Sequence, residues 1–131
     1  MNNPQLNSVI KLFSKKRNII LIPHNSPDAD ALGSCLALYF FFKSKNEVNI
    51  ISPNEYTDIL NFLPGSKNVL VYENDKEKCE NTFKKADVIF TLDFNSLGRA
   101  RNLSSLILNS KARIIMIDHH EDPENYADIT I

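Results

Sequence analysis

Aspartate and histidine side chains are concentrated in three short stretches, and they are the side chains of this sequence best suited to chemistry. The stretches are His24-Asn25-Ser26-Pro27-Asp28-Ala29-Asp30, then Asp93, then Asp118-His119-His120. All three histidines of the chain lie within them. Imidazole and carboxylate groups gathered at one place can hold a pair of divalent ions, which activate water and neutralise a phosphoryl group. The stretches therefore predict a metal site, provided that the fold brings them together.

Short apolar segments precede the three stretches, and each reads as a buried strand. These segments cover residues 18–23, 88–92 and 112–117. Further strands are expected at residues 48–51 and 69–72, and residues 127–131 look like the start of a sixth. Helical patterns lie between them, at residues 6–17, 30–45, 56–62, 73–85 and 96–108. Strands that alternate with helices predict an α/β fold: a mostly parallel sheet of about five strands with helices on both faces, in a Rossmann-like three-layer arrangement.

The carboxyl ends of parallel strands meet at one edge of a sheet, and open α/β sheets bind ligands there. We therefore expect the three stretches to converge. Asp28 and Asp30 lie two residues apart in a turn, so their carboxylates can face different ions, and Asp93 from another strand can bridge the two. Mixed imidazole and carboxylate ligation suits Mn²⁺ better than Ca²⁺ or Mg²⁺, which favour oxygen ligands alone.

Each stretch, taken alone, also has a simpler interpretation. His24 could be a hydrogen-bonded loop histidine, Asp28 and Asp30 could cap a helix, and Asp93 could cap the helix that follows it. The shared position of the stretches at one sheet edge favours the metal site. Arg99, on the helix after Asp93, could reach a phosphate or form a surface pair.

The bulk composition limits the class of protein. With 131 residues, 43% of them hydrophobic and 24% charged, the chain suits one soluble domain with one core. The net charge of −1 offers no basic track for a long nucleic acid, whereas a short anionic substrate held by metals fits. Cys35 and Cys79 suggest reduced thiols, residues 1–6 have no signal-peptide pattern, and the apolar run 36–42 is too short to cross a bilayer. We therefore expect a cytoplasmic protein without a membrane partner.

The three motifs, in this order, resemble those of the DHH phosphoesterase family, over about residues 6–131. That family includes RecJ-like exonucleases, family II inorganic pyrophosphatases, and small oligoribonucleases that also dephosphorylate adenosine 3′,5′-bisphosphate. Asp30-Ala31-Leu32-Gly33-Ser34 and Phe62-Leu63-Pro64-Gly65 look most like the bifunctional oligoribonuclease branch.

The resemblance implies a ligand set for two metal ions, expected to be Mn²⁺, with Mg²⁺ or Co²⁺ as alternatives. His24 and Asp28 would hold the first ion, and Asp30 and His119 the second. Asp93 would bridge both ions. Two positions depart from the family pattern: Ala29 stands where the family usually has glycine, and Ser26 stands where asparagine is common.

The resemblance also implies the catalytic residues. His120 would contact the substrate phosphate or its leaving group, Asp118 would orient the histidine pair, and Asp93 would act through the metals. The implied reaction is hydrolysis of short RNA oligonucleotides, adenosine 3′,5′-bisphosphate, or both, by a metal-activated water. A cyclic-dinucleotide phosphodiesterase and a non-catalytic nucleotide-binding module remain the alternatives.

The family's fourth motif aspartate and its C-terminal substrate-binding domain have no counterpart in this sequence. We therefore expect residues 1–131 to be an incomplete DHH N-terminal domain that binds at least one divalent ion and, by itself, hydrolyses slowly or not at all. The expected partners are a short oligonucleotide or nucleotide substrate and no long duplex. The oligomeric state is left undecided, with a homodimer as one option.

Overall fold

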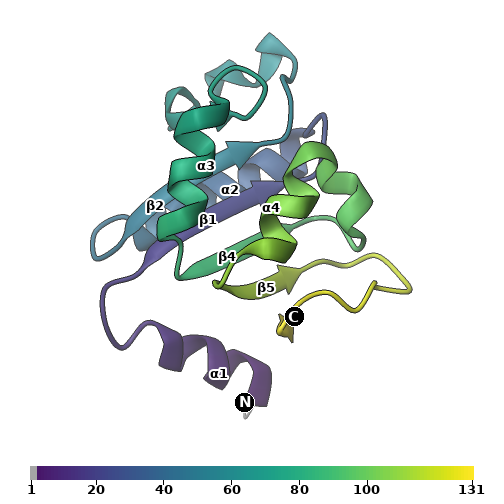
Figure 1. Cartoon of the computed structure of the whole chain (residues 1–131). Coiled ribbons are helices and arrows are strands. Elements are labelled where there is room, and N and C mark those ends of the chain that lie inside the picture. The colour runs from purple at the N-terminus through teal and green to yellow at the C-terminus, as the bar shows by residue number, and fades with distance from the viewer. Residues whose placement is uncertain (1–2) are drawn as a thin grey trace.

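The computed structural model describes residues 3–131; residues 1 and 2, where the expected domain begins, lie outside this range. Its strands are β1 (Asn18–Pro23), β2 (Glu47–Ser52), β3 (Val69–Val71), β4 (Val88–Leu92), β5 (Arg113–Ile117) and β6 (Ile129–Thr130). They form one sheet in the order β3-β2-β1-β4-β5-β6, and every pairing is parallel (Figure 1). The expected parallel sheet is confirmed, and the sixth strand is a short one.

The strand order places β1 and β4 side by side at the centre of the sheet. From β1 the chain builds outward through β2 and β3, then crosses back to β4 and builds outward through β5 and β6. The order therefore reverses between β1 and β4. In open α/β sheets, ligands bind beyond the carboxyl ends of the strands at such a reversal.

Helices cover both faces of the sheet. They are α1 (Pro4–Leu12), α2 (Ala29–Phe42), α3 (Lys76–Lys85) and α4 (Ser104–Asn109), joined by the 3₁₀ segments η1 (Asp58–Phe62), η2 (Ser66–Asn68) and η3 (Leu97–Leu103). Buried residues of α1 and α2 pack on one face, and buried residues of α3, η3 and α4 pack on the other. The expected three-layer α/β fold is therefore confirmed.

Strand β1 shows why the sequence of a central strand is continuously apolar. Ile19 and Leu21 belong to the core beneath α2, whereas Ile20 and Ile22 belong to the core beneath α3 and α4. All four are at most 1% exposed. Alternate side chains of a strand point to opposite faces, and here both faces are covered, so neither set can be polar.

The helices differ from the expected ones mainly in type and length. The segment expected at residues 56–62 is 3₁₀, and the one expected at residues 96–108 divides into η3 and α4. Within η3 itself, Arg101 forms a kink, because its φ of 52° and ψ of −122° are not helical. Within residues 3–131, no helix is long and apolar enough to cross a membrane.

Candidate metal centre

His24 follows directly after β1 and its side chain is only 8% exposed. Its Nδ1 lies 2.7 Å from the carbonyl oxygen of Asn25. That oxygen can only accept, so Nδ1 is the donor and Nε2 is the ring nitrogen left to bind a metal ion. Nε2 lies 3.7 Å from Oδ1 of Asp28 and 3.8 Å from Oδ2 of Asp93. Two ligand atoms that are each about 2.1 Å from one ion lie at roughly such separations.

Asp28 is both a helix cap and a neighbour of His24. It is the N-cap residue of α2, and its Oδ1 accepts a hydrogen bond of 2.9 Å from the amide of Ala31. The simpler interpretation as a cap is therefore correct for Asp28, yet the side chain is 63% exposed and faces His24. One carboxylate can serve both purposes because it has several lone pairs.

Asp93 is the first residue after β4 and has a left-handed backbone, with φ at 64°. Its amide donates to the carbonyl oxygen of Ile117, at the end of the neighbouring β5, over 3.0 Å. Its Oδ1 lies 3.1 Å from Nε2 of His119, while its Oδ2 faces His24. A left-handed aspartate stores about 1–3 kcal/mol of strain, and such residues cluster at functional sites. The strained turn aims one carboxylate between two histidines.

The Asp118-His119-His120 triplet follows β5, and its two histidines contact different carboxylates. The side chain of Asp118 is 2% exposed, and its two oxygens contact the Nδ1 and the amide of His120, at 2.5 and 3.0 Å. His119 instead directs Nε2 towards Asp93, and its side chain is 81% exposed. Asp118 therefore orients His120 in this structure, while Asp93 contacts His119.

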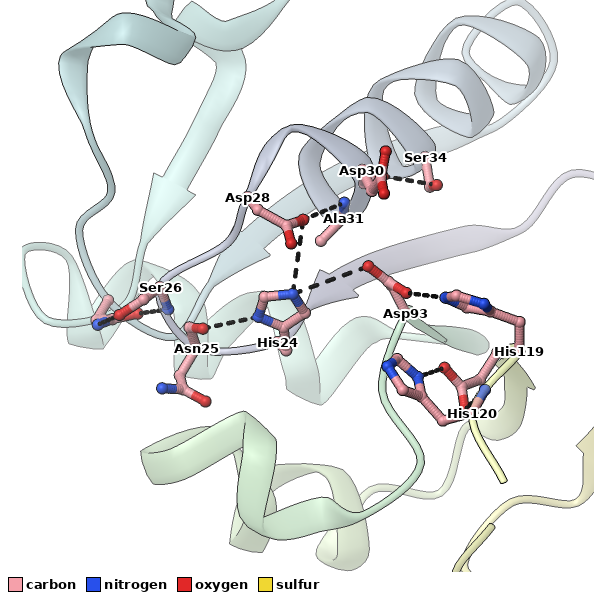
Figure 2. Close-up of polar contacts among 12 residues, drawn as sticks. His24, Asn25, Ser26, Asp28, Asp30, Ala31, Ser34, Asp93, His119 and His120 are labelled. Carbon is pink, nitrogen blue, oxygen red and sulfur yellow. Dashed lines mark hydrogen bonds and ion pairs between the residues drawn. The ribbon is translucent and has the colours of Figure 1, made fainter. Parts of the chain in front are cut away.

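These side chains form two groups of prospective metal ligands, which share one carboxylate (Figure 2). The first group is His24, Asp28 and Asp93, and the second is Asp93, His119 and His120. Within each group, one ligand atom from every residue lies within 4.8 Å of the others. The mixture of imidazole and carboxylate donors fits a transition-metal ion such as Mn²⁺.

Asp30 does not join either group. It was expected in a turn, but α2 begins at Ala29, so Asp30 lies inside the first helical turn. Asp28 is the N-cap residue and has an extended backbone, whereas Asp30 is helical, so the two carboxylates leave the chain from different backbone conformations. Figure 2 shows it beside Ser34, whose hydroxyl donates to the Asp30 carbonyl oxygen over 2.8 Å. His120 lies next to Asp93 and His119 instead.

Residues 18–131 match the DHH family, N-terminal domain, and cover most of the chain. This chain belongs to the DHH family. Among solved structures, an exopolyphosphatase-related protein from Bacteroides fragilis is 42% identical, with a TM-score of 0.94. The alignment covers 97% of this chain and 38% of that protein, so the DHH chain described here spans well under half of its neighbour's length.

A second solved structure shares the fold of this DHH domain. It is an α-glucosyltransferase in complex with UDP and a DNA 13-mer, 13% identical, with a TM-score of 0.62 over 89% of this chain and 37% of that one. An identity this low carries the fold alone. The comparison with curated proteins finds no match. The family resemblance is thus confirmed, while the oligoribonuclease branch stays a prediction.

One hydrogen bond that holds the site could not be predicted from the sequence. The amide of Asn25 donates to the carbonyl oxygen of Arg99 over 2.6 Å, so Arg99 has a backbone role whatever its side chain does. Backbone contacts of this kind leave no signature in residue type.

Cys35 lies in the core and is 0% exposed. Burial, followed by the negative charge of Asp93, raises the pKa of its thiol.

Proposed function

We propose that this chain is the metal-holding N-terminal domain of a metal-dependent phosphoesterase that hydrolyses short RNA oligonucleotides, adenosine 3′,5′-bisphosphate, or both. The observation that carries the proposal is the position of Asp93 between two ligand groups, with one oxygen facing His24 and the other facing His119. A carboxylate shared in this way suits two ions close together, the arrangement used to displace groups at phosphorus. Membership of the DHH family supports the same chemistry.

In this proposal, His24 and Asp28 would hold one Mn²⁺ ion, Asp30 and His119 would hold a second, and the carboxylate of Asp93 would serve both. Such a pair of ions lowers the pKa of water and neutralises charge on a phosphoryl group.

His120 has a separate task, because Asp118 occupies its Nδ1 and leaves Nε2 available. We propose that Nε2 contacts the substrate phosphate or transfers a proton to the leaving group. Asp118 holds the ring in that orientation, as carboxylate partners of catalytic histidines do.

We further propose that a second domain, following this one in the natural protein, binds the substrate. The neighbour from Bacteroides fragilis is much longer than this chain, which agrees with that arrangement. The isolated chain should therefore bind metal yet turn over slowly. The net charge of −1 suits a short substrate better than a long duplex. The free, buried thiols of Cys35 and Cys79 support a reducing cytoplasm.

The test measures product release in Mn²⁺ from 5′-phosphorylated diadenylate and from adenosine 3′,5′-bisphosphate. A cyclic dinucleotide and inorganic polyphosphate are run beside them, the latter because of the neighbour's name. The chain is assayed alone and with the following domain, and EDTA is the control. We expect turnover of the first two substrates that EDTA abolishes. Turnover of the cyclic dinucleotide alone, or of inorganic polyphosphate alone, would make that compound the substrate and overturn the proposed one. Metal binding without any turnover would favour a nucleotide-binding module.

A further inference from the structure

The loop that carries His24 and Asp28 contains a residue whose backbone conformation needs support. Ser26, midway between them, has φ at 48°, in the left-handed region. Crowding of the Cβ atom makes the left-handed region unfavourable for serine. In a flexible loop, a serine would readily change to another backbone conformation. Something outside the loop must therefore hold Ser26 in place.

Asn54 supplies that hold through both ends of its side-chain amide. Its Oδ1 accepts a hydrogen bond of 2.5 Å from the amide of Ser26, and its Nδ2 donates to the hydroxyl oxygen of Ser26 over 3.0 Å. The two residues are 28 positions apart in the sequence. Only a side chain with an acceptor and a donor on neighbouring atoms can make both contacts, so asparagine is well matched to the position.

Asn54 is itself anchored to the sheet. The hydroxyl of Ser52, the last residue of β2, donates to the carbonyl oxygen of Asn54 over 2.6 Å. Ser52 is 0% exposed, and β2 pairs directly with β1. The support for the loop therefore comes from a rigid neighbouring strand, which is the arrangement that a well-ordered site requires.

The hold on Ser26 reaches His24 through Asn25. The Asn25 carbonyl oxygen accepts from Nδ1 of His24, and its amide is bound by the carbonyl oxygen of Arg99. Arg99 thus binds the loop at Asn25 and Asn54 binds it at Ser26. Figure 2 shows Ser26, Asn25 and His24 in this loop, with the contact between Asn25 and His24. We propose that Asn54 is a positioning residue of the metal centre, holding the loop so that His24 and Asp28 both face Asp93. This inference rests on the proposed function, because it assumes that those side chains bind metal.

The test compares Asn54→Leu with Asn74→Leu. Asn74 is a control of the same residue type, since it is exposed and its Nδ2 donates to Oε1 of Glu55 and not to Ser26. The dissociation constant for Mn²⁺ is measured by titration calorimetry, and amide hydrogen exchange at Asn25, Ser26 and Asp28 is measured without metal. Loss of a partner that orients a metal ligand typically weakens binding roughly 10–100-fold. We expect about 10-fold weaker binding and faster exchange for Asn54→Leu, and neither for Asn74→Leu.

Ser26→Gly separates positioning from a general structural effect. Glycine adopts a positive φ without help, so the loss caused by Asn54→Leu should be smaller in a Ser26→Gly background. Strictly additive losses would overturn the inference, and so would unchanged Mn²⁺ binding or unchanged exchange in Asn54→Leu. If the unmutated chain binds no Mn²⁺, the proposed function fails, while the exchange of the Asn25, Ser26 and Asp28 amides still decides whether Asn54 holds the loop.

Discussion

Asp93 shows at the scale of one residue how the site trades stability for geometry. Its carboxylate faces a histidine on either side, and its backbone is left-handed. Glycine would be relaxed at this φ, whereas aspartate pays a conformational cost there and places its carboxylate at the site. Residues retained despite local strain are the ones expected to matter for function.

Replacing Asp93 with glycine should therefore change stability and metal binding in opposite directions. Relief of the left-handed strain is expected to raise the free energy of unfolding of the metal-free protein by about 0.5–1 kcal/mol. Loss of the shared carboxylate should weaken Mn²⁺ binding more than about 100-fold, beyond what losing a hydrogen-bonded partner of a ligand costs. Urea unfolding and titration calorimetry measure the two effects.

Asp122→Gly is the matched control for this prediction. Asp122 also has a left-handed φ, of 52°, but it is not among the ligand groups within residues 3–131. The control should gain stability to a similar extent and keep its Mn²⁺ affinity. Normal Mn²⁺ binding by the Asp93→Gly protein would contradict the bridging role proposed for Asp93.

At the scale of elements, hydrogen bonds join the loop after β5 to β4 and to η3, the segment that follows β4. The hydroxyl of Tyr126 pairs with that of Thr91, inside β4, at 2.7 Å. Glu124 accepts from the amide of Leu97 over 2.8 Å. These contacts join the segment that carries the histidines to the strand that carries Asp93, so the second ligand group depends on them.

Tyr126→Phe tests that fastening. Thr91 is 0% exposed, so its hydroxyl would lose its partner in a buried place, at a cost of about 1–2 kcal/mol. Tyr39→Phe is the control, because the Tyr39 hydroxyl has no hydrogen bond within residues 3–131. Urea unfolding at pH 7 should show the loss for Tyr126→Phe alone. Equal effects of the two substitutions would show that the Thr91 contact contributes nothing particular.

Tyr126→Phe should also change how the free energy of unfolding depends on pH in alkaline solution. Burial raises the pKa of Tyr126 from 10.0 to about 12. Between these values the unfolded chain releases the proton and the folded chain retains it, so stability falls as pH rises through that window. Phenylalanine has no proton to release, so the decline between pH 10 and 12 should be shallower in Tyr126→Phe, measured by urea unfolding across that range.

At the scale of the whole molecule, the ligands come from the ends of three strands that are adjacent in one sheet, β1, β4 and β5. Metal binding should therefore stabilise the whole domain rather than one loop. A ligand that binds only the folded state at about 100 times its dissociation constant adds about 2.7 kcal/mol.

Saturating Mn²⁺ should accordingly raise the unfolding midpoint of the chain, and EDTA should reverse the shift. Ca²⁺ at the same concentration should stabilise less, because it favours oxygen ligands over imidazole. Calorimetric melting of the chain in each ion measures this. An equal shift with both ions would point to general screening of carboxylates and would contradict a site built on histidine.

Much of this architecture is determined by sequence. Mostly apolar runs such as residues 18–23 and 88–92 specify buried strands, and their alternation with helices specifies a parallel sheet. Polar residues placed directly after those runs must then lie at the carboxyl edge, which is why His24, Asp93 and His119 could be assigned to one place. Each of these inferences rests on neighbours in the chain.

Tertiary structure alone decided which side chains meet. The pairing of β1 with β4 puts Asp93 beside His24, and the pairing of β4 with β5 puts it beside His119. The start of α2 at Ala29 placed Asp30 inside the first helical turn, and the return of the chain after β2 brought Asn54 onto Ser26. Such contacts join residues 26, 28 or 69 positions apart, and they depend on strand order and helix phase. Local sequence patterns specify neither, because each is settled by how the whole core packs.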